Sequence, residues 1–360
     1  MLVFYINFFT MFLYGFLYLL KPIKKVKLII TILISAQLIL LLGMRKYDIN
    51  GDTFNYYYYS FRYLEMGDFS SFWGKTFSIS GNYIYKVFNL IVWRLGGNYQ
   101  AFLFVMALLE IIPFSIFIYK HSQNFVMSFV VLLSFNFYFY SFITIRQIIA
   151  YGIMLLNIEN VFNKKPIRFI AIVLLVSQIH ISALFFLPAY LLIYFKPNFT
   201  TLSIFGLIGI FFIVFGKALL TLVINLFFTK YEIIESPSVV FLLFNLFIFL
   251  LCFVIYKKTN DVDASQTKDE FQTKNNYFLM LYLTGILLMT FCTITNNALR
   301  IAQFYSVSVI LVLPNCLSKM DKQTKIITYP FVYIGLFFVF LRIMSSVSTG
   351  MPAYIPFWAN

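Results

Sequence analysis

Two arginines stand at the starts of apolar segments, where a charge is costly unless it has a partner or faces water. Arg146 lies in the segment SFITIRQIIAYG and Arg300 in TNNALRIAQFY. A guanidinium is planar and permanently charged, so it can bind a phosphate through two parallel hydrogen bonds. We therefore expect Arg146 and Arg300 to bind a phosphate or diphosphate, with Arg45 as a third candidate. The alternative for each of them is anchoring to lipid headgroups or pairing with Asp or Glu.

Two other residues could accept a proton in a reaction at such a site. His180 lies in the apolar segment LLVSQIHISALFF, and an imidazole titrates near neutrality, which suits proton transfer. Asp52 lies in a polar segment just before the tyrosines Tyr56 to Tyr59, whose rings could stack on sugars. A buried histidine can also be a packing residue, and Asp52 can also be a helix N-cap. Which of the two is the general base stays open.

Other kinds of chemistry lack their sequence motifs. The chain has no Walker motif, no GxGxxG, no HExxH and no CxxC, so ATP-driven, dinucleotide and zinc chemistry have no support. The three cysteines lie in apolar segments and show neither metal-ligand spacing nor the arrangement of a disulfide framework. We expect no cofactor and no bound metal.

The composition decides what kind of scaffold must position these residues. Of 360 residues, 61% are hydrophobic, 21% are aromatic and only 11% are charged. Soluble domains are about 25% charged, so the chain is expected to be an all-α polytopic membrane protein. The net charge of +14 would suggest nucleic acid as a partner of a soluble protein. In a membrane protein it first reports topology, and we expect no nucleic-acid binding.

Apolar runs long enough to cross the bilayer recur along the sequence and predict about 10–12 transmembrane helices, with both termini outside. The segment 201–228 is apolar but hard to divide. Because Arg168 and Lys257 are both expected inside, the stretch 188–228 must cross twice or not at all. The other expected spans are 1–20, 27–44, 99–119, 124–143, 146–162, 168–187, 239–256, 277–295, 298–316 and 326–344.

Lysine and arginine are distributed differently among the expected loops. The connectors expected to be cytoplasmic hold 15 of the 27 basic residues, and 14 of these 15 are lysines. Six of the seven arginines fall outside or at outer helix ends. The positive-inside rule does not distinguish the two residue types, so the outer arginines again favour an outward-facing phosphate site.

The domain organisation follows from the expected spans. Residues 1–256 should form an N-terminal transmembrane bundle, in which 44–98 is a long extracytoplasmic segment after the second helix. Within this segment, 83–95 predicts a helix that is too short and too charged for a confident span. The polar stretch 257–276 is a candidate cytoplasmic linker. Residues 277–360 then form the C-terminal transmembrane helices and an extracytoplasmic tail.

The order of these motifs resembles the EpsG/Wzy-type polysaccharide polymerase family of the bacterial envelope. The resemblance rests on GDT-x-x-Y (51–56), IRQ-x-x-A (145–150) and H-x-SA (180–183). It continues with Arg300 and Tyr305, and with the aromatic tail YIPFW (354–358). Together these motifs extend in order over most of the chain.

The resemblance implies a membrane glycosyltransferase with its active site on the outer face of the bacterial cytoplasmic membrane. Such polymerases transfer a growing glycan from undecaprenyl diphosphate to the terminal sugar of a new lipid-linked repeat unit. The implied partners are undecaprenyl-diphosphate-linked oligosaccharide, membrane lipids, a chain-length regulator and a flippase. Arg146, Arg300 and Arg45 would bind diphosphate, His180 or Asp52 would be the base, and Tyr56 and Tyr305 would bind sugar.

Other classes of protein remain as alternatives. A repeat-unit flippase would also need arginines for diphosphate, but it should place charges through the depth of the membrane and show repeated halves. A polyprenyl-phosphate-sugar-dependent glycosyltransferase would use acids such as Asp48 and Asp52 with a metal ion. An O-antigen ligase-like enzyme and a purely structural subunit are further alternatives, and the latter does not explain the separation of lysine from arginine.

Overall fold

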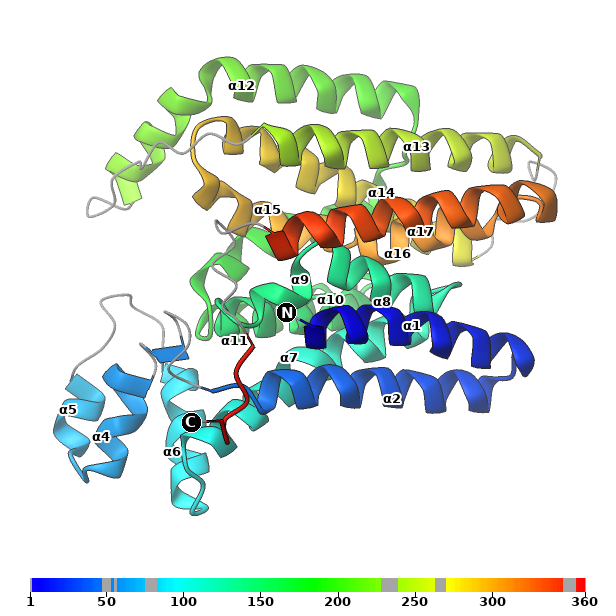
Figure 1. Cartoon of the computed structure of the whole chain (residues 1–360). Helices are drawn as coiled ribbons and strands as arrows, with labels where there is room; N and C mark the ends of the chain where they lie inside the picture. Colours follow the sequence, from blue (N-terminus) through cyan, green and yellow to red (C-terminus); the bar gives the residue numbers. More distant parts are fainter. Residues whose placement is uncertain are drawn as a thin grey trace. The chain divides into compact units, whose positions relative to one another are not determined.

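A computed structural model gives the fold of the chain, and it describes residues 2–46, 53–54, 57–74, 83–227, 239–262, 270–345 and 354–359. Every regular secondary-structure element in this part is a helix, and no strand occurs among these residues. The only β-type contact in the described ranges is an isolated bridge between Arg45 and Pro356. The expected all-α polytopic fold is therefore confirmed (Figure 1).

Seven helices of the described ranges are long and apolar enough to cross a membrane, which makes the chain a multi-pass membrane protein. An eighth span results if the bent pair α15 (Leu299–Ser306) and α16 (Val309–Ser318), with a bend of 47°, is counted as one. The seven are α1 (Leu2–Leu20), α2 (Lys24–Gly43), α7 (Tyr99–His121), α12 (Phe199–Phe227), α13 (Val240–Val262), α14 (Glu270–Met289) and α17 (Lys322–Ser345).

This number is lower than 10–12 because several expected spans are short or interrupted helices. The stretch 124–143 contains α8 (Phe125–Ser134) and α9 (Phe137–Tyr140), separated at Asn136, whose φ of 68° ends the first helix. The stretch 168–187 contains α11 (Pro166–Ser177) and part of η3 (Ile181–Tyr194). Between them the expected span 146–162 forms one helix, α10 (Ile145–Phe162).

The segment between α2 and α7 contains short helices. These are η2 (Tyr57–Phe61), α4 (Arg62–Glu65), α5 (Phe69–Gly74) and α6 (Tyr83–Arg94). The helix expected at 83–95 is confirmed as α6. Lys86 of α6 is buried, and its ammonium donates hydrogen bonds to the carbonyls of Phe72 (2.6 Å) and Trp73 (3.0 Å) at the end of α5. Burial lowers the pKa of Lys86.

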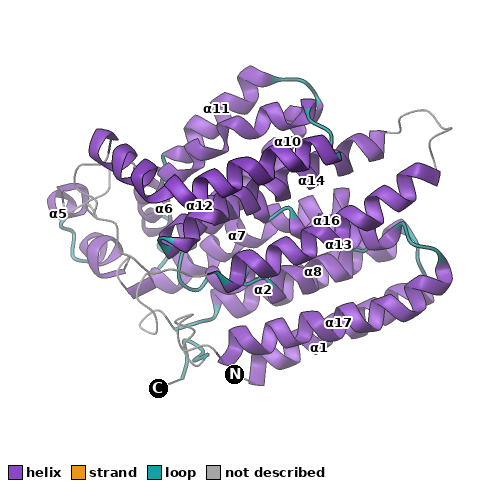
Figure 2. Ribbon diagram, turned by 90° about the horizontal axis from the view of Figure 1, so that it is seen from above, coloured by secondary structure: helices purple, strands orange, loops and turns teal. Residues whose placement is uncertain are grey.

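The chain divides into two compact units. The first unit comprises residues 1–157, 171–181 and 326–360. Within it α2 packs along α7, and α1 lies beside α17, where the rings of Phe8 and Phe340 are 4.5 Å apart (Figure 2). Helices α1 and α17 thus meet through aromatic rings, whereas α2 has no aromatic residue and packs through its aliphatic side chains.

The second unit comprises residues 158–170 and 182–325. Its closest helix pair is α14 and α15, which meet at Gly285. A Cβ atom at this position would lie 2.6 Å from the backbone nitrogen of Ser306. Small residues allow this kind of close backbone approach between membrane helices. Helices α13 and α14, which flank residues 263–269, both belong to this unit, and a linker function of 257–276 stays a prediction.

Replacing Gly285 with alanine should destabilise the protein because the added Cβ meets backbone and not a flexible side chain. Overpacking of this kind costs about 1–3 kcal/mol. The melting temperature of the detergent-purified protein measures the effect. Gly335→Ala in α17 is the matched control, since nothing lies within 4 Å of its Cβ position. Equal melting temperatures of the two variants would contradict the close packing of α14 on α15.

Candidate functional site

The candidate residues from the sequence fall in both units. Arg45, Arg146 and His180 belong to the first unit, and Arg300 and Tyr305 belong to the second. Asp52 and Tyr56 lie outside the described residues.

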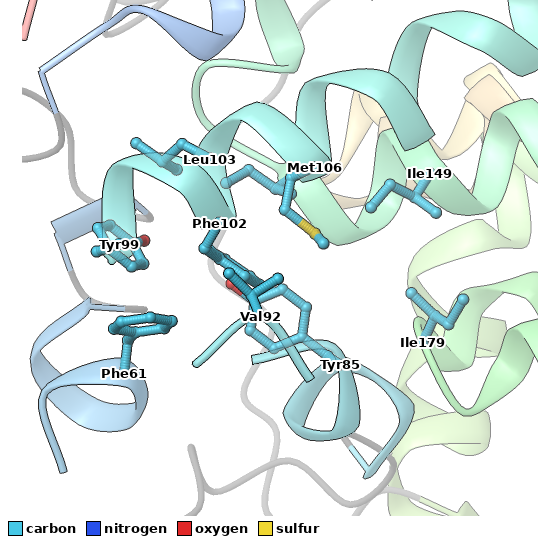
Figure 3. Close-up of a cluster of buried hydrophobic side chains, with 10 residues drawn as sticks. Phe61, Tyr85, Val92, Tyr99, Phe102, Leu103, Met106, Ile149 and Ile179 are labelled. Atoms are coloured by element: carbon cyan, nitrogen blue, oxygen red, sulfur yellow. The ribbon is translucent and has the colours of Figure 1, made fainter. Parts of the chain in front are cut away.

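A buried apolar cluster brings the surroundings of Arg146 and His180 together in the first unit. Ile145, which precedes Arg146, and Ile179, which precedes His180, are both buried in it. Figure 3 shows Ile149 of α10 and Ile179 at the end of the cluster away from Phe61 and Tyr99. The remaining members come from η2, α6 and α7: Phe61, Tyr85, Val92, Tyr99, Phe102, Leu103 and Met106. The cluster thus holds the residue that directly precedes each of the two polar residues.

Arg146 is the second residue of α10 and is half-buried. The carbon of its guanidinium lies 5.8 Å from the ring centre of Tyr85, a residue of α6. A cation over an aromatic face is attracted by the negative charge of the ring face. A residue of the segment after the second span therefore contacts Arg146. Tyr85 was not expected from the sequence, where its only signal is its place in the stretch 83–95.

His180 lies in the interruption between two helices. Its backbone N–H donates to the carbonyl of Val176 (3.0 Å), which closes the last turn of α11, and η3 begins at the next residue. The imidazole is half-buried. A turn inside the membrane-spanning region has fewer backbone hydrogen bonds of its own than a helix, so its position depends on the side chains around it. Here Ile179 supplies that anchor.

Arg45 is deeply buried, with 3% of its surface exposed. Its guanidinium donates to the carbonyls of Leu42 (2.7 Å) and Ser141 (3.4 Å) and lies 5.2 Å from the ring centre of Phe142. Burial lowers the pKa of Arg45, and the negative charge of Glu110 opposes that change. These partners give Arg45 a structural role at the end of α2. Its assignment to diphosphate stays a prediction.

Arg300 occupies the corresponding place in the second unit. It is the second residue of α15 and its side chain is exposed. The chain reaches it through two short 3-10 turns, η4 (Thr290–Thr293) and η5 (Asn296–Ala298). Both Arg146 and Arg300 thus lie in the first turn of a helix. The helix dipole favours an anion there and disfavours a lone cation.

Tyr305 supports the backbone of η3. Its ring is buried, and its hydroxyl donates a hydrogen bond of 2.6 Å to the carbonyl of Phe185. In a 3-10 helix this carbonyl would accept from the N–H of residue 188, but Pro188 has none. Tyr305 therefore supplies the donor that the proline lacks. The expected role of Tyr305 in sugar binding stays a prediction.

The described residues contain no group of three or more His, Cys, Asp or Glu side chains that could hold a metal ion. Asp48 and Asp52 lie outside this part of the chain. The candidate residues within the described ranges are three arginines, one tyrosine and His180.

A family model described as the EpsG family matches residues 28–357, nearly the whole chain. The chain belongs to the EpsG family. Membership indicates a polysaccharide polymerase-type function and, at this coarse level, a glycosyltransferase-like enzyme. No curated protein and no solved structure matches this EpsG-family chain.

Removing the hydroxyl of Tyr305 should destabilise this EpsG-family protein, and the loss should depend on Pro188. Tyr305→Phe removes the hydrogen bond to the partly buried carbonyl of Phe185, which contributes about 0.5–1.5 kcal/mol. Pro188→Ala restores a backbone N–H at the correct position. We therefore expect Tyr305→Phe to lower the melting temperature less in the Pro188→Ala background than in the wild type.

Tyr277 provides the control for this cycle. Its hydroxyl donates to the carbonyl of Ala189 (3.1 Å), and the 3-10 partner of this carbonyl is Leu192, which has an N–H. Tyr277→Phe should therefore have the same effect in both backgrounds. If Tyr305→Phe also has the same effect in both, Tyr305 does not replace the donor missing at Pro188.

Proposed function

We propose that this EpsG-family protein polymerises lipid-linked oligosaccharide repeat units on the outer face of the bacterial cytoplasmic membrane. The growing glycan moves from undecaprenyl diphosphate to the terminal sugar of a new lipid-linked unit. The observation that supports the proposal is the cluster that holds Ile145 and Ile179, since it places the neighbours of two candidate residues, Arg146 and His180, in one unit. The guanidinium of Arg146 also lies over the ring of Tyr85.

The proposed reaction is a direct displacement at the anomeric carbon. The oxygen of the acceptor hydroxyl forms the new glycosidic bond while the bond to the diphosphate oxygen breaks, and the diphosphate leaves with the electron pair. Arg146 and Arg300 stabilise the charge that develops on the leaving group. His180 or Asp52 takes the proton of the hydroxyl. One displacement inverts the anomeric configuration.

The proposed partners are those that the family resemblance implies. The donor and the acceptor both carry a polyprenyl tail, which needs apolar surface at the depth of the bilayer. Helices α12 and α17 offer such surface, since only 6% and 11% of the residues in their most apolar stretches are buried in the protein. Membrane lipids cover the rest of these faces. A flippase supplies the acceptor, and a chain-length regulator ends the polymerisation.

The glycan ladder tests this function directly. In a strain that lacks the protein, lipid-linked glycans should remain single repeat units, and the wild-type gene should restore a ladder on a gel. Arg146→Ala, Arg300→Ala and His180→Ala should each reduce polymerisation by about 10²–10³-fold, the range for losing one electrostatic or acid–base group. Arg168→Ala is the control: it removes the same type of side chain, but in the lysine-rich turn 164–168 that is expected to be cytoplasmic. This variant should leave the ladder intact.

Two outcomes of this experiment would overturn the polymerase proposal. Single units that accumulate only on the inner face would identify a flippase. Absence of complete units would identify an enzyme that acts earlier in the assembly. Loss of the ladder in Arg168→Ala at normal protein levels would show that the arginine variants do not report on the outer site.

Polymerisation should continue in the presence of EDTA, because the proposed reaction uses arginines and not a metal ion to stabilise the leaving diphosphate. The measurement is the rate of glycan elongation in inside-out and right-side-out membrane vesicles with and without chelator. Loss of activity with EDTA and recovery with a divalent cation would instead favour a polyprenyl-phosphate-sugar-dependent glycosyltransferase that uses Asp48 and Asp52.

A further inference from the structure

Helices α11 and η3 run antiparallel to each other. Phe169, near the start of α11, packs against two residues of the central part of η3: its ring centre is 6.1 Å from that of Phe186 and 5.4 Å from that of Tyr190. From Phe169 to Gln178 α11 rises about 14 Å at 1.5 Å per residue. From Ile181 to the midpoint of Phe186 and Tyr190 η3 returns about 14 Å at 2 Å per residue. The two arms have equal lengths on either side of the turn at 178–180.

Tyr277 of α14 contacts the chain on both sides of this turn. Its ring centre lies 5.3 Å from that of Phe162, at the end of α10, and its hydroxyl donates to the carbonyl of Ala189. One continuous helix from 162 to 189 would separate these residues by about 40 Å. The chain between them must therefore fold back.

The charges at the two ends of the fold-back agree with this geometry. Lys164, Lys165 and Arg168 precede or begin α11, and Lys196 follows η3. Positive residues gather on the cytoplasmic side of membrane helices. Both ends of the segment therefore have the positive charge that is typical of the cytoplasmic side.

The next two helices agree with the same arrangement. Helix α12 is continuous over 199–227, so it contributes one crossing and not the two or none expected from the sequence. Its first residue, Phe199, lies 5.6 Å from the ring of Phe253, and the ammonium of Lys257 lies 5.3 Å from the Phe199 ring centre. The start of α12 and the end of α13 thus share one level. Two crossings by α12 and α13 return the chain to the side from which α12 started.

We propose that residues 164–196 form a re-entrant hairpin, which enters and leaves the membrane on the lysine-rich side and carries His180 in its turn. Helix α11 is only about 18 Å long, so the turn lies within the hydrocarbon of about 30 Å. Irregular backbone at that depth requires internal partners. The hydroxyls of Tyr277 and Tyr305 supply two of them, on Ala189 and Phe185.

The hairpin changes the expected position of His180, the candidate base, relative to the two membrane faces. In a single crossing, residues beyond His180 would continue to the outer face. In the hairpin, His180 is the deepest polar residue of a segment that is attached to the lysine-rich side at both ends. The inference concerns topology, and it holds whether or not the protein is a polymerase.

Cysteine labelling in whole cells and in inverted vesicles tests the hairpin with the full-length protein. The three native cysteines are buried and are replaced with alanine. Single cysteines then replace exposed residues at the two ends of the segment, Lys165 and Lys196. A membrane-impermeant maleimide should label both positions only in inverted vesicles, where the cytoplasmic face is accessible. A position that stays unlabelled on both faces is moved to its exposed neighbour Lys164 or Asn198.

Helix α13 provides the matched control, because it crosses once. Val239→Cys and Lys258→Cys, at exposed residues on either side of its apolar core, should be labelled from opposite faces, with Lys258 on the face of Lys165 and Lys196. Labelling of Lys165→Cys and Lys196→Cys from opposite faces would overturn the hairpin. Since no activity is measured, failure of this proposal and failure of the polymerase reaction are separate results.

Discussion

The hydrogen-bonding capacity of the backbone inside the membrane is the constraint on which the fold depends. A helix satisfies its own N–H and C=O groups, so each interruption must find partners among side chains or other backbone groups. Pro188 shows the principle most clearly: it leaves the carbonyl of Phe185 without a donor, and the hydroxyl of Tyr305, 120 residues away in the sequence, replaces it. Asn124 satisfies a backbone donor in a similar way at the start of α8, where its side-chain oxygen accepts a hydrogen bond from the N–H of Met127.

The interruptions are also where the candidate residues lie. Arg146 follows the turn after α9, His180 lies between α11 and η3, and Arg300 follows η4 and η5. A protein that needs polar groups within the bilayer has to break its helices there, and the broken ends bring helix N-termini with them. A helix N-terminus and a guanidinium both favour an anion, which is the reason that Arg146 and Arg300 remain candidates for diphosphate binding.

The sequence could predict the membrane class and the long helices because apolar composition over 18 or more residues is a strong signal. It did not predict the turn at 178–180, because the run 168–187 is long enough for one crossing even though Ser177, Gln178, His180 and Ser182 interrupt its apolar residues there. The break depends on tertiary contacts, such as those of Phe169 with η3. For the same reason Arg146 and His180 could be chosen as candidates, but their common apolar cluster could not be foreseen. Arg45 was chosen on charge alone, and its buried partners depend on packing.

The separation of lysine from arginine gains a physical reason from the contacts of the two residue types. In the second unit Lys274, Lys257 and Lys319 lie over the rings of Phe162, Phe199 and Tyr256. The ammonium group of such a lysine has to reach only the polar region at the helix ends, and the long flexible side chain allows this without further partners. In the first unit Arg62, Arg94 and Arg146 also lie over aromatic rings.

A stacked guanidinium differs from a stacked ammonium because its donors stay in the plane, directed away from the ring, in a geometry that matches two phosphate oxygens. Lys86 of the first unit also lies over aromatic rings, so the distinction lies in the shape of the guanidinium and not in the ring contact itself. Positive-inside topology requires cations on one face and is indifferent to their type. The use of arginine outside the connectors expected to be cytoplasmic therefore requires a second cause, and a pair of phosphate oxygens is a ligand that the guanidinium geometry fits.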